Sequence, residues 1–475
     1  MSSQARDGTM ASWAGKRKGS EMDKQEAARA RFGLLNENQL DLLHAASLRV
    51  LAEAGVNVHS PALRGLLKSA GARVDGVRAF IPGRLVETAL STAPPRIVLH
   101  DRQGKPAMDL QGRNAYYGTG SDLEFTLDLG DGRRRRSTLE DVARSARLCD
   151  RLANIDFVMS YALPADVPGD QRETEQMRVM LAGTRKPIIM TIFSGEASYR
   201  QVHELACRAC GGDRSFRAAP NYIMYGQFIS PLQHDSGSLD RLIFSADHAV
   251  PLIYVPTIML GASGPVTLAG SVALANAECL AGLVMHQLRA PGAPFIYGGC
   301  VSPLDMKTTV FTYGSPEWRQ ADAMLSELSL RYRLPIFGTA GATYSKAVDA
   351  QAGAEWAYSL LYAAMCGTNL IHDVGYLESG LTGSLEALVI CDEIVSLVKK
   401  ALAPVGLDEA SLALEDIIRV GPGGHHMSED HTLAHFREVW YPAFFDRGRL
   451  EGSRQGGRSD LIARARRKAE DLLGG

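Results

Sequence analysis

The sequence predicts an α/β protein built as a TIM (β/α)8 barrel, with an N-terminal helical and β cap and a C-terminal helical extension. From about residue 140, helix-patterned segments alternate with short apolar runs whose starts lie roughly 30 to 45 residues apart. The runs are continuously apolar, which is typical of parallel strands buried on both faces. No Gly-x-Gly-x-x-Gly pattern follows the first run, so the barrel is favoured over a dinucleotide-binding sheet.

Seven apolar runs are predicted to form barrel strands, and an eighth candidate completes the count. They occupy residues 155–163, 187–194, 221–230, 251–259, 294–300, 335–341, 369–375 and, for the eighth candidate, 416–421. We therefore predict a flexible tail over 1–30, a cap over 31–139, the barrel over 140–424 and a helical extension over 425–475.

The predicted cap begins with a helix within residues 35–55, where apolar residues recur near one face and Gly55 follows as a C-terminal cap. Two further short helices and hairpin-rich β structure follow. The four consecutive arginines at 133–136 are interspersed with nearby carboxylates, and Thr138 with Asp141 forms a capping-box pattern immediately after them. We therefore interpret the arginine run as a solvated turn before a helix.

Composition and charge exclude several classes of function. The chain has 475 residues, a net charge of -2 and no run of 18 apolar residues, so charge and hydropathy favour neither a nucleic-acid partner nor a membrane. The N-terminal segment lacks the apolar stretch of a secretion signal. Of seven cysteines only Cys207 and Cys210 form a CxxC pair, which alone is weak for zinc or redox chemistry. We expect a cytoplasmic homo-oligomer.

In a TIM barrel the active site lies at the carboxyl ends of the strands. The predicted ends are rich in aromatic and small residues and poor in metal ligands. They carry Phe193, Ser194, Phe228, Ser230, Tyr297, Gly298, Gly299, Cys300, Thr339, Gly341, His372 and Asp373. Lys346 is a candidate Schiff-base lysine, although its position several residues beyond a strand equally suits an ordinary loop lysine.

The segment 421–436 contains a third of the chain's twelve histidines. His431 and His435 are four residues apart, as in a helical zinc site, but Thr432 stands where a zincin has glutamate. Ser428 is a natural N-cap for a helix here. The Gly-rich turn before that helix could also hold an anion. The metal interpretation is therefore weak, but it remains an alternative.

Several long motifs resemble one family. Residues 338–380 (GTAGATYSKAVDAQAGAEWAYSLLYAAMCGTNLIHDVGYLESG) and 421–447 (GPGGHHMSEDHTLAHFREVWYPAFFDR) resemble the late barrel and C-terminal signature of the trimethylamine corrinoid methyltransferase superfamily. Residues 42–58 and 127–163 are also similar to that family. The resemblance extends from about residue 35 to 450 and is specific in the two late motifs.

The resemblance implies a barrel that moves a methyl group from an amine to the cobalt of a separate corrinoid protein. Founding members carry pyrrolysine in the barrel, whereas every position here is a standard residue. Relatives that share this departure act on quaternary amines such as glycine betaine. The chain is therefore expected to be a non-pyrrolysine, glycine betaine methyltransferase-like member, with the lost residue equivalent to a position in 334–346.

The chemistry of a quaternary amine agrees with the absence of pyrrolysine. A tertiary amine must be activated before its methyl group is taken, because the departing group would otherwise be a poor amide anion. A quaternary ammonium is already cationic and releases a neutral tertiary amine without an acid on the enzyme. The protein then needs to hold the cation, align one methyl group and exclude water.

This chemistry predicts an aromatic cage with a carboxylate beside it. The candidate substrate-binding residues are Tyr116, Tyr117, Phe193, Phe228, Glu278, Tyr297, Tyr344 and Gln351. His372 and Asp373, at the end of the run 369–375, are the predicted catalytic pair. Aromatic residues of a barrel are often core residues instead, and a structural histidine is nearly as good an interpretation of His372.

The C-terminal signature is expected to lie at the barrel mouth, where Gly423, Gly424, His425 and His426 would contact the corrinoid protein. The two glycines would allow close backbone approach. The expected cofactor is cobalamin or another corrinoid carried by that partner, with no metal bound directly. Two alternatives remain: a metal-dependent barrel hydrolase or lyase that uses the C-terminal histidines, and a non-catalytic betaine-binding protein.

Overall fold

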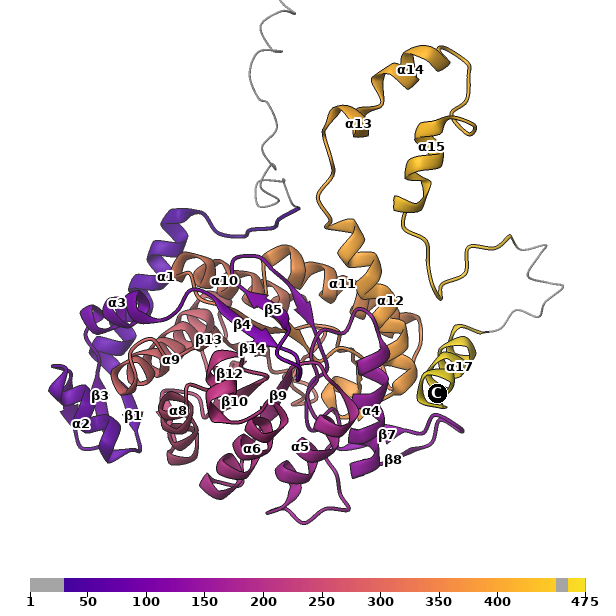
Figure 1. The fold of residues 1–475 in the computed structure, drawn as a ribbon. Helices are drawn as coiled ribbons and strands as arrows, with labels where there is room; N and C mark the ends of the chain where they lie inside the picture. The colour runs from indigo at the N-terminus through magenta and orange to yellow at the C-terminus, as the bar shows by residue number, and fades with distance from the viewer. Residues whose placement is uncertain (1–29, 450–459, 475) are drawn as a thin grey trace, which may run out of the picture. The chain divides into compact units, whose positions relative to one another are not determined.

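The computed structural model describes residues 30–449 and 460–474 (Figure 1). The predicted tail therefore lies, apart from residue 30, outside the described residues. The chain divides into two compact units. One comprises residues 31–401 and 441–475, and the other comprises residues 1–30 and 402–440.

The N-terminal part of the first unit is helical with short strands. Asn36 caps the first helix in a capping box with Gln39, and Ser60 caps the second. The elements are α1 (Glu37–Arg49), η1 (Val50–Ala54), β1 (Val56–Val58), α2 (Pro61–Ser69), β2 (Arg73–Asp75), β3 (Arg78–Phe80), α3 (Gly83–Thr92), β4 (Ile97–His100) and β5 (Pro106–Leu110).

A curled sheet of parallel strands forms the centre of the same unit (Figure 1). Its strands follow the order β6-β16-β15-β13-β12-β10-β9, with β14 pairing β12 off this path. They are β6 (Tyr116–Tyr117), β9 (Ile188–Thr191), β10 (Tyr222–Phe228), β12 (Leu252–Leu260), β13 (Phe295–Gly298), β14 (Cys300–Pro303), β15 (Ile336–Thr339) and β16 (Leu370–His372). Isolated parallel bridges, Gly118 to Phe157 and Val158 to Ile188, connect one segment to both end strands of this path.

Helices connect successive strands of the sheet, which agrees with the predicted alternation. They are α4 (Leu139–Arg151), α5 (Arg172–Gly183), α6 (Glu196–Ala209), α7 (Asp213–Ala218), α8 (Ser236–His248), α9 (Leu268–Arg289), α10 (Pro316–Tyr332), α11 (Ala350–Cys366) and α12 (Leu385–Ala401). By length and hydropathy α9 could span a membrane, but 78% of its apolar window is buried inside the protein. It packs on β12, α1 and α3, as a core helix does.

Three smaller sheets complete the described part of the unit, and one of them is the β4–β5 pair. β11 (Gln233–His234) pairs in parallel with β1, and β17 (Tyr376–Leu377) and β18 (Thr382–Gly383) join β7 (Phe125–Leu127) and β8 (Arg134–Arg136). The short η2 (Glu378–Gly380) lies between β17 and β18, and α17 (Leu461–Gly474) packs on α12 and α4. Arg134, Arg135 and Arg136 pair with carboxylates of the same unit, so the arginine run has local partners.

The second unit contains α13 (Glu409–Leu412), α14 (Leu414–Val420), α15 (Asp430–His435) and η3 (Phe436–Glu438). The strand predicted at 416–421 is therefore wrong, because these residues lie mainly in α14. A run of only six residues cannot distinguish helix from strand by periodicity. The parallel sheet instead gains β6 from within the predicted cap, so its strands span residues 116–372.

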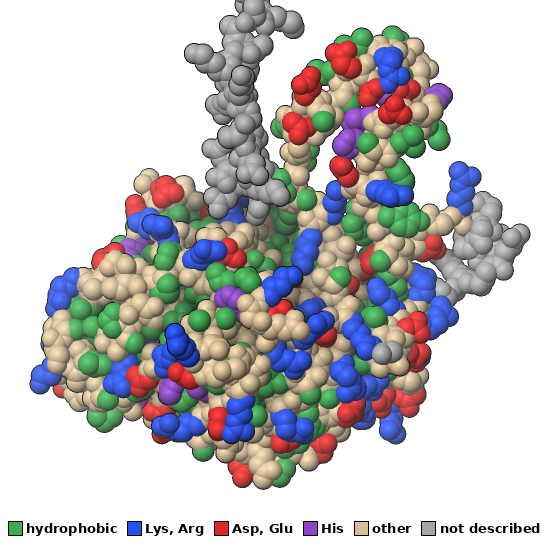
Figure 2. Space-filling model, viewed as in Figure 1, with side chains coloured by type: hydrophobic (Ala, Val, Ile, Leu, Met, Phe, Trp, Pro, Cys, Tyr) green, Lys and Arg blue, Asp and Glu red, His purple; other side chains and the backbone are tan. Residues whose placement is uncertain are grey.

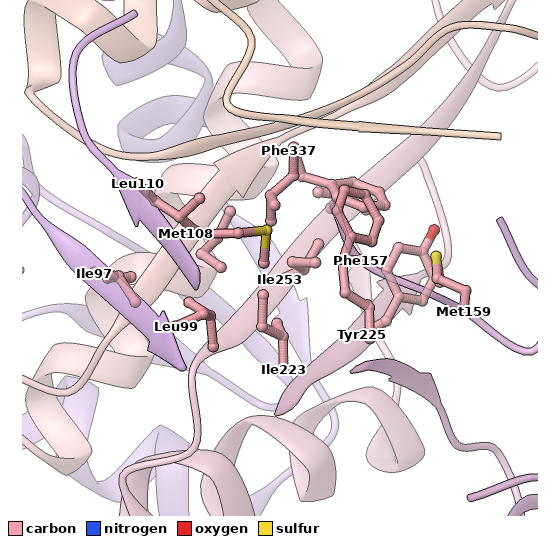
Figure 3. Close-up of a cluster of buried hydrophobic side chains, with 14 residues drawn as sticks. Ile97, Leu99, Met108, Leu110, Phe157, Met159, Ile223, Tyr225, Ile253 and Phe337 are labelled. Atoms are coloured by element: carbon pink, nitrogen blue, oxygen red, sulfur yellow. The ribbon is translucent and has the colours of Figure 1, made fainter. Parts of the chain in front are cut away.

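A buried cluster shows which end of the sheet is filled (Figure 3). Ile97 and Leu99 of β4 and Met108 and Leu110 of β5 are buried against residues near the starts of the sheet strands. Those strand residues include Ile189, Ile223, Ile253, Ile296, Phe337 and Leu370. The β4–β5 hairpin therefore closes the amino-terminal end of the sheet with hydrocarbon, and polar chemistry is left to the carboxyl end.

Candidate active site

A cavity of about 310 Å³ lies at the carboxyl ends of the parallel strands. Its lining comes from segments that follow or end the strands of the curled sheet, as expected for sites on parallel α/β folds. It is lined by Ser121, Asp122, Met159, Thr191, Phe193, Tyr225, Gln227, Thr257, Cys300, Phe311, Tyr313, Thr339, His372, Asp373, Tyr376 and Gly380.

Two carboxylates line this cavity, and both sit on strained backbone. Asp122 follows β6 with φ of 68°, and Asp373 follows β16 with φ of 73°. Non-glycine residues with positive φ are uncommon, and they cluster at functional sites where the surrounding structure holds them. β6 and β16 are paired neighbours in the sheet, so the two carboxylates come from adjacent strand ends.

Asp373 is tightly enclosed. Its side chain lies 3.5 Å from Nε2 of His372, and only 4% of the residue is exposed. A Cβ atom on Gly120 would lie 1.9 Å from Oδ1 of Asp373 and 2.2 Å from the Tyr376 hydroxyl oxygen, so glycine is required there. The Tyr376 hydroxyl donates to the Ser121 carbonyl at 2.6 Å, which fixes the ring against the two carboxylate-bearing segments.

Desolvation dominates the electrostatics of both carboxyl groups. Burial raises the pKa of Asp373 to about 8, although the Tyr376 hydroxyl and Arg319 act in the opposite direction. Burial also raises the pKa of Asp122 to about 6, against hydrogen bonds from Ser121 and Ser160. A cation that entered the cavity would favour the ionised form of each group, so these carboxyls are suited to receiving positive charge.

His372 is a neutral group in this site. Its Nδ1 lies 2.9 Å from the Gly338 carbonyl, to which the N–H donates, and its ring stacks on Phe337 with centroids 3.9 Å apart. Burial lowers the pKa of His372 to about 3. Near neutral pH the imidazole therefore adds no charge beside Asp373.

Aromatic rings make up much of the remaining wall. Tyr225, Phe311, Tyr313 and Tyr376 are accompanied by Phe193, whose ring is 61% exposed at the end of β9. Burial raises the pKa of the Tyr225, Tyr313 and Tyr376 hydroxyls well above the ordinary value, so these rings are uncharged. Aromatic faces beside a carboxylate are the groups that recognise alkylammonium ions.

A buried ion pair supports the floor of the cavity. Arg319 of α10 lies 3.0 Å from Asp322, both are almost fully buried, and Arg319 also donates to the Thr339 carbonyl at the end of β15. Burial raises the pKa of Asp322 to about 7, against the attraction of the guanidinium. Arg319 is thus a positioning residue for Thr339.

The structure brings only some of the predicted site residues to this cavity. Phe193, His372 and Asp373 line it, as do Cys300 and Thr339 from the predicted strand ends. The other candidates have different surroundings, because an inward or outward direction depends on the pleat of each strand.

Two predicted cage residues lie toward the amino-terminal part of the sheet. Tyr116 packs against the buried hydrophobic cluster, and its hydroxyl accepts from the Asp109 N–H at 2.9 Å. Tyr117 is buried with the Lys399 ammonium 5.5 Å from its ring centroid. Neither residue lines the cavity. β6 ends at Tyr117, and the chain reaches the cavity only further on, at Ser121 and Asp122.

Three further candidates make contacts away from the cavity. Phe228 stacks on Tyr254 with centroids 4.6 Å apart, and the Tyr297 hydroxyl donates to Asn276 at 2.8 Å. Glu278 of α9 is fully buried, accepts from Ser230 at 2.8 Å and from the Leu232 N–H, and has a pKa raised to about 7 by burial. These contacts are structural and lie away from the cavity lining.

The remaining predicted residues are exposed or partly exposed. The backbone N–H of Tyr344 donates to Glu355 at 2.9 Å, and Gln351 donates to the same carboxylate at 2.8 Å. Neither residue is among those lining the cavity. Gly423, Gly424, His425 and His426 belong to the separate unit 402–440, so their docking role stays a prediction.

The metal alternative can be compared with the described histidines. Nε2 of His431 lies 3.1 Å from the Ala410 carbonyl, and Nδ1 of His435 lies 2.8 Å from Glu438. Across residues 30–449 and 460–474, the candidate group of three metal-ligand side chains is His203, Asp213 and His248, on the outer helices α6 to α8. The C-terminal histidines are not part of that group.

Several lining residues were not predicted. Tyr225 and Gln227 alternate within β10, Tyr313 lies in the segment before α10, and Tyr376 begins β17. Two-residue alternation within the run 221–230 could have indicated the first pair, since alternate side chains share a face. No pattern of spacing connects Asp122 with Asp373, because only the pairing of β6 with β16 brings them together.

The fold and the cavity define an α/β protein with a small-molecule site at the carboxyl ends of a curled parallel sheet. The family described as trimethylamine methyltransferase (MTTB) matches residues 3–475. The chain belongs to this methyltransferase family, as the sequence motifs predicted.

Relatives and solved structures agree with that assignment. The chain is 30% identical over 446 residues to trimethylamine methyltransferase MttB of Desulfitobacterium hafniense (strain DSM 10664 / DCB-2), covering 93% of this chain and 90% of the relative. It is 30% identical over 421 residues to glycine betaine methyltransferase of Desulfitobacterium hafniense (strain Y51), covering 88% and 87%. It is 31% identical over 452 residues to MttB of Methanosarcina barkeri (strain Fusaro / DSM 804), covering 93% and 90%.

Among solved structures, the monomethylamine methyltransferase MtmB of Methanosarcina barkeri has the same fold. It aligns with a TM-score of 0.52 at 9% identity, covering 93% of this chain and 89% of that chain. The hydroxylamine complex of MtmB aligns with a TM-score of 0.53 at 11% identity, with the same coverage. At this identity the likeness concerns the fold alone.

Proposed function

We propose that the protein transfers a methyl group from a quaternary amine to the cobalt of a corrinoid carried by a partner protein, with release of a tertiary amine. The observation that carries this proposal is that two desolvated carboxyls and several aromatic rings line one cavity at the ends of the strands. Glycine betaine is the compound named for one relative and is the first substrate to test.

The reaction class follows from what the cavity offers. When bound, the reduced corrinoid supplies the electron pair that takes the methyl carbon, and the pair of the broken C–N bond stays on nitrogen as a neutral tertiary amine. No proton is needed for this leaving group. His372 is held neutral, and the carboxyls have the role of stabilising the cation and aligning its methyl groups.

The enclosing fold is part of the proposal. The bridges of residues 157 and 158 to Gly118 and Ile188 support closure of the curled sheet as a (β/α)8 barrel. In that arrangement the β4–β5 hairpin fills one end, and the methyl donor and the corrinoid approach from the other. Water that the bound substrate and the docked partner displace from the cavity would not compete for the cation.

The corrinoid-carrying partner needs a surface around the cavity. Large apolar side chains are exposed on segments that follow successive strands of the sheet: Phe193, Ile229, Val266, Met306, Val310 and Leu381. Exposed apolar patches of this kind mark interaction sites. These residues support docking over the strand ends, and the predicted contacts of Gly423, Gly424, His425 and His426 would add to it. Homo-oligomer formation and cytoplasmic location stay predictions.

A spectroscopic experiment tests the function. Purified protein is mixed with chemically reduced cobalamin and one compound at a time from a panel of glycine betaine, proline betaine, carnitine, choline, tetramethylammonium and trimethylamine. The proposal expects methylcobalamin with at least one quaternary amine and little with trimethylamine. Trimethylamine as the best substrate would contradict the proposal, and binding without transfer for every quaternary amine would favour a non-catalytic binding protein.

A further inference from the structure

The charge of the cavity is one-sided. Two of its lining residues, Asp122 and Asp373, carry carboxyl groups, and no lysine or arginine lines it. His372 adds no positive charge, because burial holds its imidazole neutral. A third carboxylate, Glu173, lies behind the wall and accepts from Ser194 and from the backbone N–H of Phe193. The electrostatic field inside the cavity is therefore that of an acidic site.

The arginines nearest this site have other partners. Arg319 is paired with Asp322 beneath the floor, as described above. Arg241 donates to the Ile192 carbonyl at 2.8 Å and to the Gln227 carbonyl at 2.9 Å, and its guanidinium lies 5.1 Å from the Phe193 ring centroid. Both guanidinium groups are fixed by backbone oxygens at strand ends and are not directed at a ligand carboxylate.

Arg172, at the start of α5, differs from these two. Its buried Nε has no hydrogen-bond partner, and its charge acts on the carboxyl of Asp122. It does not line the cavity. If the substrate carried a carboxylate, Arg172 would be the residue to bind it, so a variant at this position can separate the two cases.

The rest of the cavity wall, which includes Ser121 beside Asp122, carries neutral hydrogen-bonding groups. The Ser121 and Thr191 hydroxyls lie 3.0 Å apart, and the Gln227 amide donates to the Thr257 hydroxyl. Gln227 and Thr257 lie on β10 and β12, which are paired with each other, and β15 and β13 separate β12 from β16 in the order of the sheet. This side can accept or donate a hydrogen bond but offers no charge to a carboxylate.

We propose that the substrate is a monocation, a quaternary ammonium whose other end is an uncharged hydroxyl, as in choline, and not a zwitterionic betaine. The ammonium would lie against Asp122, Asp373 and the aromatic rings, and the hydroxyl would contact the Thr191, Gln227 and Thr257 groups. A carboxylate placed in the same cavity would meet two carboxyls without a basic partner, which is unfavourable. The inference rests on the proposed function, and the bond broken and the neutral amine released are those described above.

Binding and turnover together test the inference. Titration calorimetry at pH 8.5 compares tetramethylammonium, choline and glycine betaine, and the methylcobalamin assay gives kcat/KM for each. We expect choline to exceed glycine betaine at least tenfold in affinity and in kcat/KM, with tetramethylammonium also bound. Equal or better binding and use of glycine betaine would overturn the inference while leaving the proposed function intact. If no amine is turned over, the proposed function fails, and the order of affinities still decides the charge preference.

Variants add a second test. Asp122→Asn should reduce the ratio of choline affinity to glycine betaine affinity at least fivefold, because it removes one carboxyl that repels the betaine carboxylate. Asparagine tolerates the left-handed backbone at this position. Asp240→Asn, on the exposed side of α8, is the matched control and should leave the ratio unchanged. Arg172→Gln should also leave the ratio unchanged. A selective loss of glycine betaine binding in Arg172→Gln would contradict the inference.

Discussion

The strand-end cavity and the segment 402–440 differ in how their polar groups are surrounded. The cavity contains one histidine, and its two aspartates lie on positive-φ backbone with their pKa values raised by desolvation. The segment contains four histidines, yet its helices α13, α14 and α15 contain no buried residue.

The comparison teaches that the number of metal-ligand or acid–base residue types in a stretch does not locate the chemistry. An exposed histidine interacts with water and nearby backbone. The ionised form of a carboxyl that is enclosed by protein is costly unless a positively charged group lies beside it. At the strand ends the fold creates that condition beside a cavity, because the parallel sheet directs polar groups from adjacent strands into one space.

The largest effect expected from this contrast is that of removing the enclosed charge. Asp373→Asn should lower kcat/KM for the best quaternary amine by about 100-fold at pH 8.5, because truncating one partner of a buried charge pair costs about 2–5 kcal/mol. Methylcobalamin formation measures the effect, and the melting temperature should remain close to that of the parent protein. A loss of less than threefold would mean that this carboxyl does not contact the cation.

The second largest effect is expected from a change of pH on the binding of the cation. A raised pKa near 8 means that Asp373 is largely protonated at pH 7, and a bound cation favours the ionised form, so binding releases a proton and strengthens as pH rises. Affinity for tetramethylammonium should increase about tenfold between pH 7 and pH 9 and then level. Calorimetry in buffers of different ionisation enthalpy measures both the affinity and the proton released.

His372 and Tyr376 do not titrate in that interval, because burial lowers the pKa of the first and raises that of the second. Asp122 contributes only at lower pH, since its pKa is about 6. The Asp373→Asn variant should therefore show a nearly flat profile between pH 7 and pH 9. Affinity that falls as pH rises would contradict the assignment of Asp373.

A smaller effect is expected when one aromatic ring of the cavity wall is removed. Tyr313→Ala should weaken binding of the quaternary ammonium by about fivefold, since each cation–π contact contributes about 0.5–2 kcal/mol. Tyr313→Phe keeps the ring face and should lose less than twofold. If both variants lose the same affinity, the Tyr313 hydroxyl, and not its ring, would be the interacting group.

The smallest effect is expected in the second region. His431→Ala should change kcat/KM by less than about twofold, because the His431 ring contacts the Ala410 carbonyl in an exposed helix. Metal analysis by plasma mass spectrometry should give the same zinc content for the parent and the variant. Zinc that is stoichiometric in the parent and lost together with activity in His431→Ala would support the hydrolase or lyase alternative.

Much of the fold could be predicted because buried parallel strands have a continuous apolar pattern. The runs at 187–194, 221–230, 251–259, 294–300, 335–341 and 369–375 contain β9, β10, β12, β13, β15 and β16. β6 was missed since its two residues lie in a hairpin-rich stretch, and α14 was mistaken for a strand because a short apolar run suits both.

The site was predictable in part for a similar reason. His372 and Asp373 stand at the end of an apolar run, and so do Phe193, Cys300 and Thr339. Phe228 and Tyr297 occupy equivalent places along their strands but contact Tyr254 and Asn276 away from the cavity, because a shift of one residue turns a side chain to the other face of the sheet. Sequence position alone does not reveal that direction.

The amino-acid sequence by itself determined the α/β class and the family, and it predicted a site at the carboxyl ends of the strands, where the cavity lies, since these depend on local apolar patterns and on long motifs. Only the tertiary structure decided that Asp122 joins Asp373. Their juxtaposition depends on the pairing of β6 with β16, which are separated by about 250 residues of chain. The physical reason is that burial and backbone strain, which make these two carboxyls receptive to a cation, exist only when distant segments enclose them.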